Sequence, residues 1–398
     1  MMEMIEAVLG DVLEIKYGKD HKKLGDGEIP LYGSGGIMKY VDNFLYDKPS
    51  ILIPRKGSLN NLFFQDKPFW TVDTLFWTKV DESKIDPKYL FYLLSLYNLT
   101  KYDEGSAIPS LTTRALNDVP ISYLKEKKEQ IEVRRVIETF DQKISLLRQQ
   151  NETLEQMAQT LFKRWFVDFE FPNEQGQPYR SAGGEMVASE LGEIPLGWEV
   201  REISDIIEVK DGTHDSPSKE KEGKYLITSK HLSKSGIDFN SAYLISEENY
   251  YNINKRSKVD SRDVLVSMIG TIGLIYFVLE TNINFAIKNI GLFKTSQNPL
   301  YSEYLYLTIN SIYGKHYFIS RSAGTTQSYL TLGVLREMPV IMPSIKILEL
   351  FKSSAELLLN KIHRNNNEIQ TLTKLRDTLL PKLMSGEIRV PTALENKV

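Results

Sequence analysis

The feature that most constrains the fold is residues 130–166, a run without glycine or proline. Apolar residues recur along this run at steps of three and four, which places them on one stripe of a single helix. At ~1.5 Å per residue the helix would be roughly 55 Å long, more than a globular domain needs for its own core. A stripe so long and narrow predicts a second helix packed beside it. The stripe comprises Val133, Ile137, Phe140, Ile144, Leu147, Leu154, Ala158, Leu161 and Trp165.

A second stripe of the same kind lies near the C-terminal end of the sequence. It comprises Leu358, Ile362, Ile369, Leu372, Leu379 and Leu383. Asn151 interrupts the first stripe, and Asn365 and Arg376 interrupt the second. Buried polar residues of this kind lower stability, but they can fix the register and orientation of paired helices. The pattern favours a two-helix antiparallel coiled coil over a pair of ordinary core helices.

Composition limits the class of protein. A chain of 398 residues can form two or three domains, and its absence of cysteine excludes disulfides and thiolate metal sites. A reducing cytoplasm fits this composition best. No apolar run reaches membrane-spanning length, and the N-terminus lacks a basic region followed by an apolar core, so we expect neither secretion nor membrane insertion. The net charge of −3 means that any DNA site must be a local basic patch.

The sequence contains an internal repeat with a very long period. The two halves match in four consecutive blocks, and the last of these aligns without a gap. The matching pairs are residues 9–18 with 203–212, 51–58 with 264–271, 89–93 with 304–307, and 105–121 with 324–340. Each half mixes short β-branched and aromatic runs with short helices before it enters its long helix, so each globular part is predicted to be α+β.

The repeat predicts the order of domains. Two similar globular domains of mixed α/β structure would be joined by two long antiparallel helices in an approximate two-fold arrangement. The connector between the halves is rich in glycine, proline and glutamate, and we expect an exposed loop without a core. The predicted bounds are 1–125 for the first globular domain, 126–170 for the first long helix, 171–198 for the connector, 199–345 for the second globular domain, 346–386 for the second long helix, and 387–398 for the tail. Double-stranded DNA has a near two-fold axis that suits this arrangement.

Several motifs resemble the specificity subunits of type I restriction-modification enzymes, and the resemblance covers nearly the whole chain. The most specific segments are residues 151–169 and 375–388. Residues 183–186 and 194–198 of the connector are also similar to the family. The openings at 29–36 and 211–217 are similar to those of the family's target-recognition domains.

The resemblance implies a non-catalytic DNA-recognition subunit. Each globular domain would read one half of a bipartite DNA sequence, and the paired helices would set the unread spacer between the halves. The helices would also dock two modification subunits, which carry S-adenosylmethionine and methylate adenine. Translocating restriction subunits, which use ATP and Mg²⁺, would complete the nuclease. The chain itself would bind no cofactor.

Candidate DNA contacts in the first half lie in three segments. Tyr32, Gly33, Ser34 and Lys39 belong to a glycine-rich loop and the strand after it; Arg55, Lys56 and Ser58 follow a buried strand; Ser106 lies at an expected helix start. Backbone amides, cations and hydroxyls in such loops can contact phosphates or base edges. An ordinary turn, solvated surface charge or a helix cap explains each of these residues equally well or better when it is taken alone.

Candidate contacts in the second half follow the same logic. They are Lys210, Thr213, His214 and Ser216 after a short strand, and Arg321, Thr325, Thr326, Gln327 and Ser328 near an expected helix start. Gln327 could read an adenine edge. The alternatives are a simple turn at Asp211-Gly212 with a solvated histidine, and hydroxyls that only cap a helix.

Three rival functions remain to be compared. The carboxylate–lysine spacings Glu14–Lys16 and Glu208–Lys210 resemble a nuclease motif, but Asp11 and Asp205 are expected on the same helical turn without a preceding strand to carry a metal ligand. The glycines at 33–36 do not form a cofactor fingerprint for self-contained methyl transfer. No catalytic or metal site emerges. A coiled-coil scaffold that binds proteins in place of DNA remains the alternative.

Overall fold

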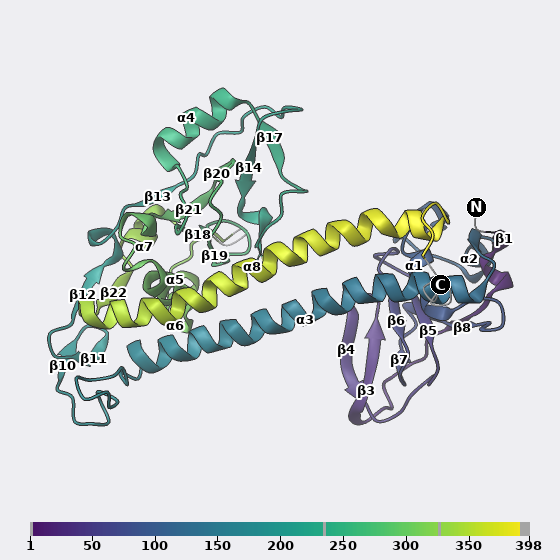
Figure 1. The fold of residues 1–398 in the computed structure, drawn as a ribbon, viewed down its shortest axis with the longest axis horizontal. Helices are drawn as coiled ribbons and strands as arrows, with labels where there is room; N and C mark the ends of the chain where they lie inside the picture. Colours follow the sequence, from purple (N-terminus) through teal and green to yellow (C-terminus); the bar gives the residue numbers. More distant parts are fainter. Residues whose placement is uncertain (1–2, 234–235, 325–327, 391–398) are drawn as a thin grey trace, which may run out of the picture. The chain divides into compact units, whose positions relative to one another are not determined.

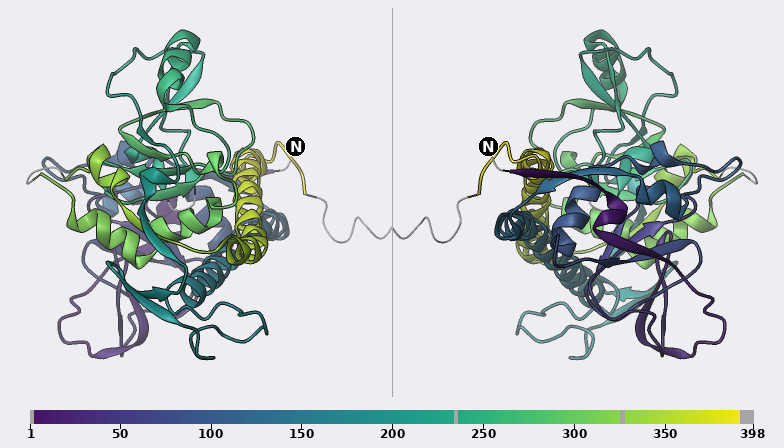
Figure 2. Two further views of the ribbon diagram at one scale, coloured as in Figure 1. Left: turned by 90° about the vertical axis from the view of Figure 1, so that its left-hand side faces the viewer. Right: turned by 90° about the vertical axis from the view of Figure 1, so that its right-hand side faces the viewer.

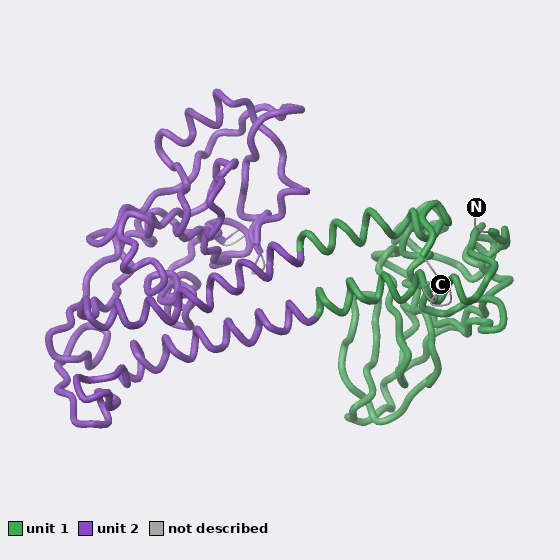
Figure 3. Tube along the Cα trace, viewed as in Figure 1, with its two compact units in different colours: residues 1–145, 370–398 green, residues 146–369 purple. Residues whose placement is uncertain are grey.

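The computed structural model describes residues 3–233, 236–324 and 328–390. The chain divides into two compact units, unit 1 with residues 1–145 and 370–398 and unit 2 with residues 146–369 (Figure 3). Each unit contains one globular part and a portion of both long helices, α3 (Lys127–Phe166) and α8 (Ile345–Met384). The boundary thus crosses both helices and does not follow the ends of the globular parts. No helix in the described ranges is long and apolar enough to cross a membrane.

The described residues of unit 1 form three small sheets (Figure 1). The first pairs β1 (Met4–Val8) with β9 (Pro120–Leu124). The second has the order β2 (Leu13–Tyr17), β8 (Leu75–Val80), β5 (Ser50–Pro54), β6 (Phe63–Gln65), and the third has the order β4 (Gly36–Val41), β3 (Asp26–Gly33), β7 (Trp70–Thr71). β3 is antiparallel to β4 and parallel to β7. The helical segments are η1 (Leu9–Asp11), α1 (Pro87–Leu94), η2 (Leu99–Tyr102) and α2 (Thr113–Asn117).

Unit 2 repeats these three sheets. β12 (Glu199–Glu202) pairs with β22 (Pro339–Met342). The four-stranded sheet has the order β13 (Val209–Asp211), β21 (Ile290–Phe293), β18 (Val264–Ser267), β19 (Ile275–Phe277), and the three-stranded sheet has β17 (Tyr243–Ile245), β14 (Lys224–Thr228), β20 (Phe285–Lys288). β14 is antiparallel to β17 and parallel to β20, as β3 is to β4 and β7. This correspondence confirms the α+β class and the internal repeat.

Further elements complete unit 2. The connector forms the hairpin β10 (Met186–Ser189) and β11 (Gly192–Pro195), and β15 (Leu232–Ser233) pairs with β16 (Gly236–Ile237). The helical segments are η3 (Ile203–Asp205), η4 (Ser229–His231), α4 (Glu247–Ser257), η5 (Thr295–Gln297), α5 (Ser302–Asn310), α6 (Ile312–Ser320) and α7 (Leu332–Arg336). α4 is therefore an addition that unit 1 lacks within its described residues.

Equivalent hydrogen bonds hold the repeated elements in the same positions. The amide of Leu9 donates to the carbonyl of Val119 (2.9 Å), and Ile203 makes the same bond to Met338 (2.9 Å). The hydroxyls of Thr112 and Thr331 cap α2 and α7 by accepting from the backbone three residues later. The prediction that a helix starts near Ser106 is therefore wrong. Ser106 lies in a loop, and α2 begins only after Thr112.

The long helices run antiparallel inside unit 2, where α3 and α8 lie side by side (Figures 1 and 2). Asn151 of α3 donates to Asn366 (2.7 Å) and accepts from Asn365 of α8 (2.8 Å). Farther along α3, Phe162 meets Phe351, which lies earlier in α8. Asn365 is fully buried, so the polar interruptions lie inside the helix pair as predicted. A register shift would leave these amides buried without partners.

Burial along the two helices is wider than the predicted stripes. Val133, Ile137, Ile144, Leu147, Asn151, Ala158 and Leu383 are buried, as expected. The remaining stripe positions are only partly buried, namely Phe140, Leu154, Leu161, Trp165, Leu358, Ile362, Ile369, Leu372 and Leu379. Phe162, Phe166, Phe351, Ala355, Leu359, Leu380 and Met384 are buried although they lie outside the stripes. The globular parts cover a second face of each helix, and a heptad pattern does not anticipate that face.

The expectation that the connector is an exposed loop without a core is wrong. Phe171, Ile194 and Trp198 are buried in the main core of unit 2. The Phe171 ring stacks on Trp198 (4.9 Å between centroids) and on Tyr179 (4.6 Å). The average composition of the segment hid these residues because they are far apart in sequence and meet only after the chain folds back on itself.

Candidate nucleic-acid interface

Three loops of unit 1 meet at one surface, which we call recognition surface 1 (residues 33–36, 55–58 and 103–110). The side-chain amide of Asn61 donates to the carbonyl of Ser34 (2.9 Å), which ties the tip of the β3–β4 hairpin to the loop after β5. The amide of Gly57 donates to the carbonyl of Pro109 (3.0 Å), and Lys56 forms a β-bridge with Ser110. The loops that carry the predicted contacts Ser34, Lys56, Ser58 and Ser106 therefore converge.

Hydrogen bonds within residues 103–110 shape the third loop. The carboxylate of Asp103 accepts from the amides of Gly105 (2.8 Å) and Ser110 (2.7 Å). These two backbone hydrogen bonds, the one from Ser110 first, lower the pKa of Asp103. Asp103 thus holds Ser106 on a closed loop at the surface, and no helix is needed to present it.

The cations of unit 1 differ in how they are held. Lys39 and Lys56 are exposed and form no ion pair with the described residues. The guanidinium of Arg55 donates to the carbonyl of Asp73 (3.2 Å) and lies 5.4 Å from the ring centre of Tyr17. Arg55 is thus oriented by its neighbours, whereas the two lysines are free to meet an anion such as a phosphate.

The structure places Tyr32 and Gly33 differently from the other candidates. The Tyr32 side chain is buried in a cluster with Leu52, Phe69 and Trp77, and its hydroxyl accepts from Gln65 (2.7 Å). Burial raises its pKa. A Cβ at position 33 would lie 2.7 Å from the sulfur of Met38, so Gly33 makes room for that side chain. Tyr32 therefore supports the hairpin from inside and does not face solvent as a base-contacting residue would.

A second set of polar residues meets in unit 2, which we call recognition surface 2 (residues 211–216, 268–271 and 288–289). The amide of Thr213 donates to the carbonyl of Ile287 (3.0 Å), and that of Asn289 donates to the carbonyl of Thr213 (3.2 Å). Lys288 donates from its ammonium to the hydroxyl of Ser216. The predicted residues Thr213, His214 and Ser216 thus lie against the turn between β20 and β21.

His214 is held from both sides. Its Nδ1 lies 2.8 Å from the side-chain oxygen of Asn289, and its Nε2 lies 3.0 Å from a carboxylate oxygen of Asp211. Arg256 of α4 donates to the other oxygen of Asp211 (2.6 Å). Lys288, Asn289 and Arg256 were missed from the sequence because they come from other elements. Asn289 has a positive φ of 53°, which asparagine tolerates better than most residues at a tight turn.

The remaining candidates of unit 2 are more scattered. Lys210 on β13 pairs with Glu208 (2.6 Å). Arg321 covers the ring of Tyr317 at 4.1 Å, and Ser328 is exposed. Thr325, Thr326 and Gln327 lie outside the described residues. Tyr329 forms a β-bridge with Ile269. This bridge is equivalent, under the internal repeat, to the bridge between Ser110 and Lys56 in unit 1.

The segments that resembled a nuclease motif contain two local ion pairs. Glu14 bonds to Lys16, and Glu208 pairs with Lys210. Strands β1 and β12 do precede Asp11 and Asp205, so the expectation that no strand comes before these residues is wrong. Among the described residues, no group of three histidine or acidic side chains could hold a metal ion.

Comparison with known proteins decides the family. The family model described as "Type I restriction modification DNA specificity domain" matches residues 3–156 and 195–371, which are the two repeated halves. The chain belongs to the specificity subunits of type I restriction-modification systems. Its function is thus recognition of a DNA target, and the two surfaces above are the candidate interfaces of this specificity subunit.

Individual relatives agree with this assignment. The type I restriction enzyme MjaIX specificity subunit of Methanocaldococcus jannaschii is 30% identical over 369 residues, which is 87% of this chain and 79% of the relative. The HindI specificity subunit of Haemophilus influenzae is 26% identical and covers 76% of this chain and 77% of its own length. A crystal structure of the S subunit from M. genitalium shares the fold, with a TM-score of 0.63, 17% identity and 96% coverage of both chains.

Proposed function

We propose that this specificity subunit reads a bipartite DNA sequence, one half with each recognition surface. The observation that carries the proposal is the pair of matching β-bridges, Lys56 with Ser110 and Ile269 with Tyr329. The backbone scaffold is the same in both units, but the side chains at these positions differ in charge, polarity and size. Two readers built alike and differing at their surface loops are suited to two different half-sites.

The long helices support a second part of the proposal, the docking of partner subunits. Large apolar side chains on α3 and α8 remain exposed in this chain and are available for contact with a partner. They are Leu146, Met157, Ile345, Leu350, Leu357 and Leu375, and each of these side chains is at least 45% exposed. We infer that they bind two modification subunits, which supply S-adenosylmethionine and methylate adenine, while restriction subunits supply ATP- and Mg²⁺-dependent cleavage. The chain itself would catalyse nothing and bind no cofactor.

A domain exchange tests the bipartite reading. The chain would be co-expressed with its modification subunit, and the methylated motif would be determined by sequencing the host DNA. Replacing residues 1–125 by the corresponding segment of a relative is expected to change one half of the motif and leave the other half and the spacer intact. A change in both halves would contradict independent reading, and an unmethylated genome with the wild-type chain would contradict the proposal as a whole.

A further inference from the structure

One carboxylate, that of Asp141 on α3, ties the globular part of unit 1 to both long helices. Further ion pairs at the start of α1, Asp86 with Arg134 and Lys88 with Glu138, reach α3. The hydroxyl of Tyr92 on α1 donates to one oxygen of Asp141 on α3 (2.7 Å), and Arg376 on α8 donates to the other (2.7 Å). Tyr92 is almost fully buried, and burial together with its bond to Asp141 raises its pKa, so its hydroxyl keeps the donated proton. Asp141 therefore joins three elements, the first helix of the globular part and both long helices.

The internal repeat identifies the equivalents of Tyr92 and Asp141 in unit 2. Residues 89–92 correspond to 304–307, so Tyr92 corresponds to Leu307 on α5. On the long helices, the buried pair at 133 and 137 corresponds to the buried pair at 351 and 355. Four residues after the second member of each pair come Asp141 in α3 and Leu359 in α8, so these two residues are equivalent.

Arg376 has an equivalent as well. The segment Arg376-Asp377-Thr378-Leu379 of α8 corresponds to Ala158-Gln159-Thr160-Leu161 of α3. The equivalent of Arg376 is therefore Ala158. The polar triad Tyr92–Asp141–Arg376 of unit 1 thus stands where unit 2 has the apolar triad Leu307–Leu359–Ala158.

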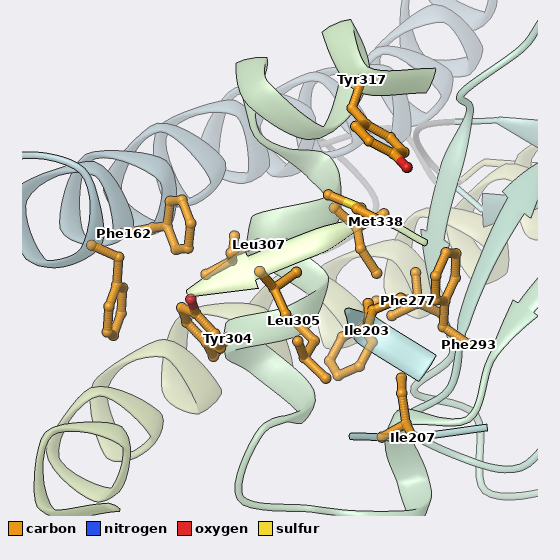
Figure 4. Close-up of a cluster of buried hydrophobic side chains, with 14 of the residues drawn as sticks. Phe162, Ile203, Ile207, Phe277, Phe293, Tyr304, Leu305, Leu307, Tyr317 and Met338 are labelled. Carbon is orange, nitrogen blue, oxygen red and sulfur yellow. The ribbon is translucent and has the colours of Figure 1, made fainter. Parts of the chain in front are cut away.

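The apolar triad belongs to a closed core. Leu307, Leu359 and Ala158 are all buried in the same cluster, and Figure 4 shows Leu307 with its neighbours from α5 and α3. Beside it, the ring of Phe277 on the edge strand β19 stacks on Tyr306 with centroids 4.8 Å apart. The cavity left at this junction is only about 50 Å³. At the positions equivalent to the triad, unit 2 therefore relies on close packing. Its polar tie to α8 lies elsewhere, where Arg262 bonds to Glu303 of α5 and Glu356 of α8.

The polar triad lies beside an open groove. The matching space in unit 1 is about 370 Å³, and its lining includes Tyr32, Phe63 and Gln65 from the recognition sheets together with Tyr92 and Asp141. The equivalent ring pair, Phe64 and Phe91, is tilted and more distant at 5.7 Å. Apolar contact across this groove is incomplete, and apolar contact has no preferred direction. Hydrogen bonds do have a direction, and those to Asp141 supply it here.

We propose that Tyr92, Asp141 and Arg376 are positioning residues that set the orientation of recognition surface 1 on the helix pair and hence the spacing between the two half-sites. The proposal rests on the bipartite function proposed above. The triad reaches that surface through the groove: Tyr32, whose hydroxyl accepts from Gln65, lies on β3 directly before the hairpin tip at residues 33–36. In unit 2 the packed residues Leu307, Leu359 and Ala158 occupy the positions of the triad.

The decisive variant replaces the polar triad of unit 1 with the apolar residue types found at the equivalent positions of unit 2. In Y92L/D141L/R376A, all three polar partners disappear together, so no buried charge is left unpaired and the melting temperature is expected to stay level or rise. The full chain would be assembled with its modification subunits and assayed on duplexes that carry the cognate spacer or one base pair more or fewer. We expect preference for the cognate spacer to fall by about tenfold, as for the loss of one or two directional contacts.

The control is D377N. Asp377 also accepts from Arg376 (2.7 Å), but it is exposed, and none of its hydrogen bonds within the described part of the chain reaches the recognition sheets. This variant should keep wild-type spacer preference. An unchanged preference in the triple variant would overturn the positioning role. If the wild-type complex recognised no bipartite motif, the proposed function would fail, and amide hydrogen exchange of α1 would still decide the inference: it should be faster in the triple variant than in D377N, and equal rates would reject it.

Discussion

The two recognition surfaces share a backbone framework but treat their charges differently. Lys39 and Lys56 of unit 1 face solvent without a carboxylate partner in the described ranges. In unit 2, Lys288 is held by the hydroxyl of Ser216, Lys210 pairs with Glu208, and Arg256 pairs with Asp211. Unpaired cations attract phosphates wherever they occur, whereas paired ones must first give up a partner. Unit 1 is therefore suited to general attraction, and unit 2 to recognition by groups that are already held in place.

The interiors of the two units also differ in their charged residues, because unit 2 buries more of them than unit 1 does within the described residues. The buried ionisable side chains of unit 2 include Asp263, Lys294 and Glu303, whereas Asp86 is the one acidic or basic side chain among the buried residues described in unit 1. A buried charge requires a partner of opposite sign, since desolvation otherwise costs several kcal/mol. The stability of unit 2 should consequently depend on individual ion pairs more than that of unit 1.

The largest expected effect follows from the buried lysine of unit 2. Lys294 donates to Asp263 (2.5 Å), which is fully buried, and to Asp260 (2.7 Å). Lys294→Met would leave Asp263 buried without its cation and should cost about 3–5 kcal/mol of unfolding free energy. Urea unfolding with tryptophan fluorescence measures the loss.

The matched substitution in unit 1 is Lys84→Met, at a half-exposed ion pair with Asp81 (3.4 Å). It should cost no more than about 1 kcal/mol. Similar losses in the two variants would contradict the claim that unit 2 depends more on its ion pairs.

A smaller effect distinguishes the recognition surfaces. Lys56→Ala should weaken DNA binding of the assembled complex several-fold and reduce the slope of log affinity against log salt by about 0.9, the value for one lost phosphate contact. Lys210→Ala should change the slope less, because Glu208 already compensates its charge. Fluorescence anisotropy across a salt series provides the measurement, and equal slope changes would remove the distinction.

The smallest effect concerns pH. Glu303 is buried and bonds to Arg262, while its second oxygen has no partner among the described residues. Burial raises the pKa of Glu303. When folding raises the pKa of an acid, the protonated acid stabilises the folded state at pH values below the pKa that it has in the unfolded chain. This contribution is lost as the pH rises through the pKa that it has in the folded protein.

Glu303→Gln should therefore flatten the stability profile above pH ~4.3, the ordinary glutamate value, by about 1 kcal/mol or less. Thermal unfolding of both chains between pH 4.5 and pH ~7.5 reports the difference. A wild-type profile parallel to that of the variant would show that Glu303 does not titrate in this range.

Much of the architecture could be predicted because it depends on local pattern. The steps of three and four along residues 130–166 require a helix whatever surrounds them, and the repeat of the two halves requires two similar folds. Asn151 and Asn365 were identified as interruptions of the stripes, and they do meet inside the helix pair. Segment identity and helix position were therefore determined by the sequence itself.

Contacts between distant segments were decided only by the tertiary structure. Nothing near Tyr32 in sequence indicates that its ring is covered by Phe69 and Trp77, and nothing near His214 indicates Asn289 as its partner. The aromatic cluster of the connector and the polar triad at Asp141 arise in the same way. Periodicity reports which face of an element is apolar, whereas burial and hydrogen bonding depend on which other element reaches that face.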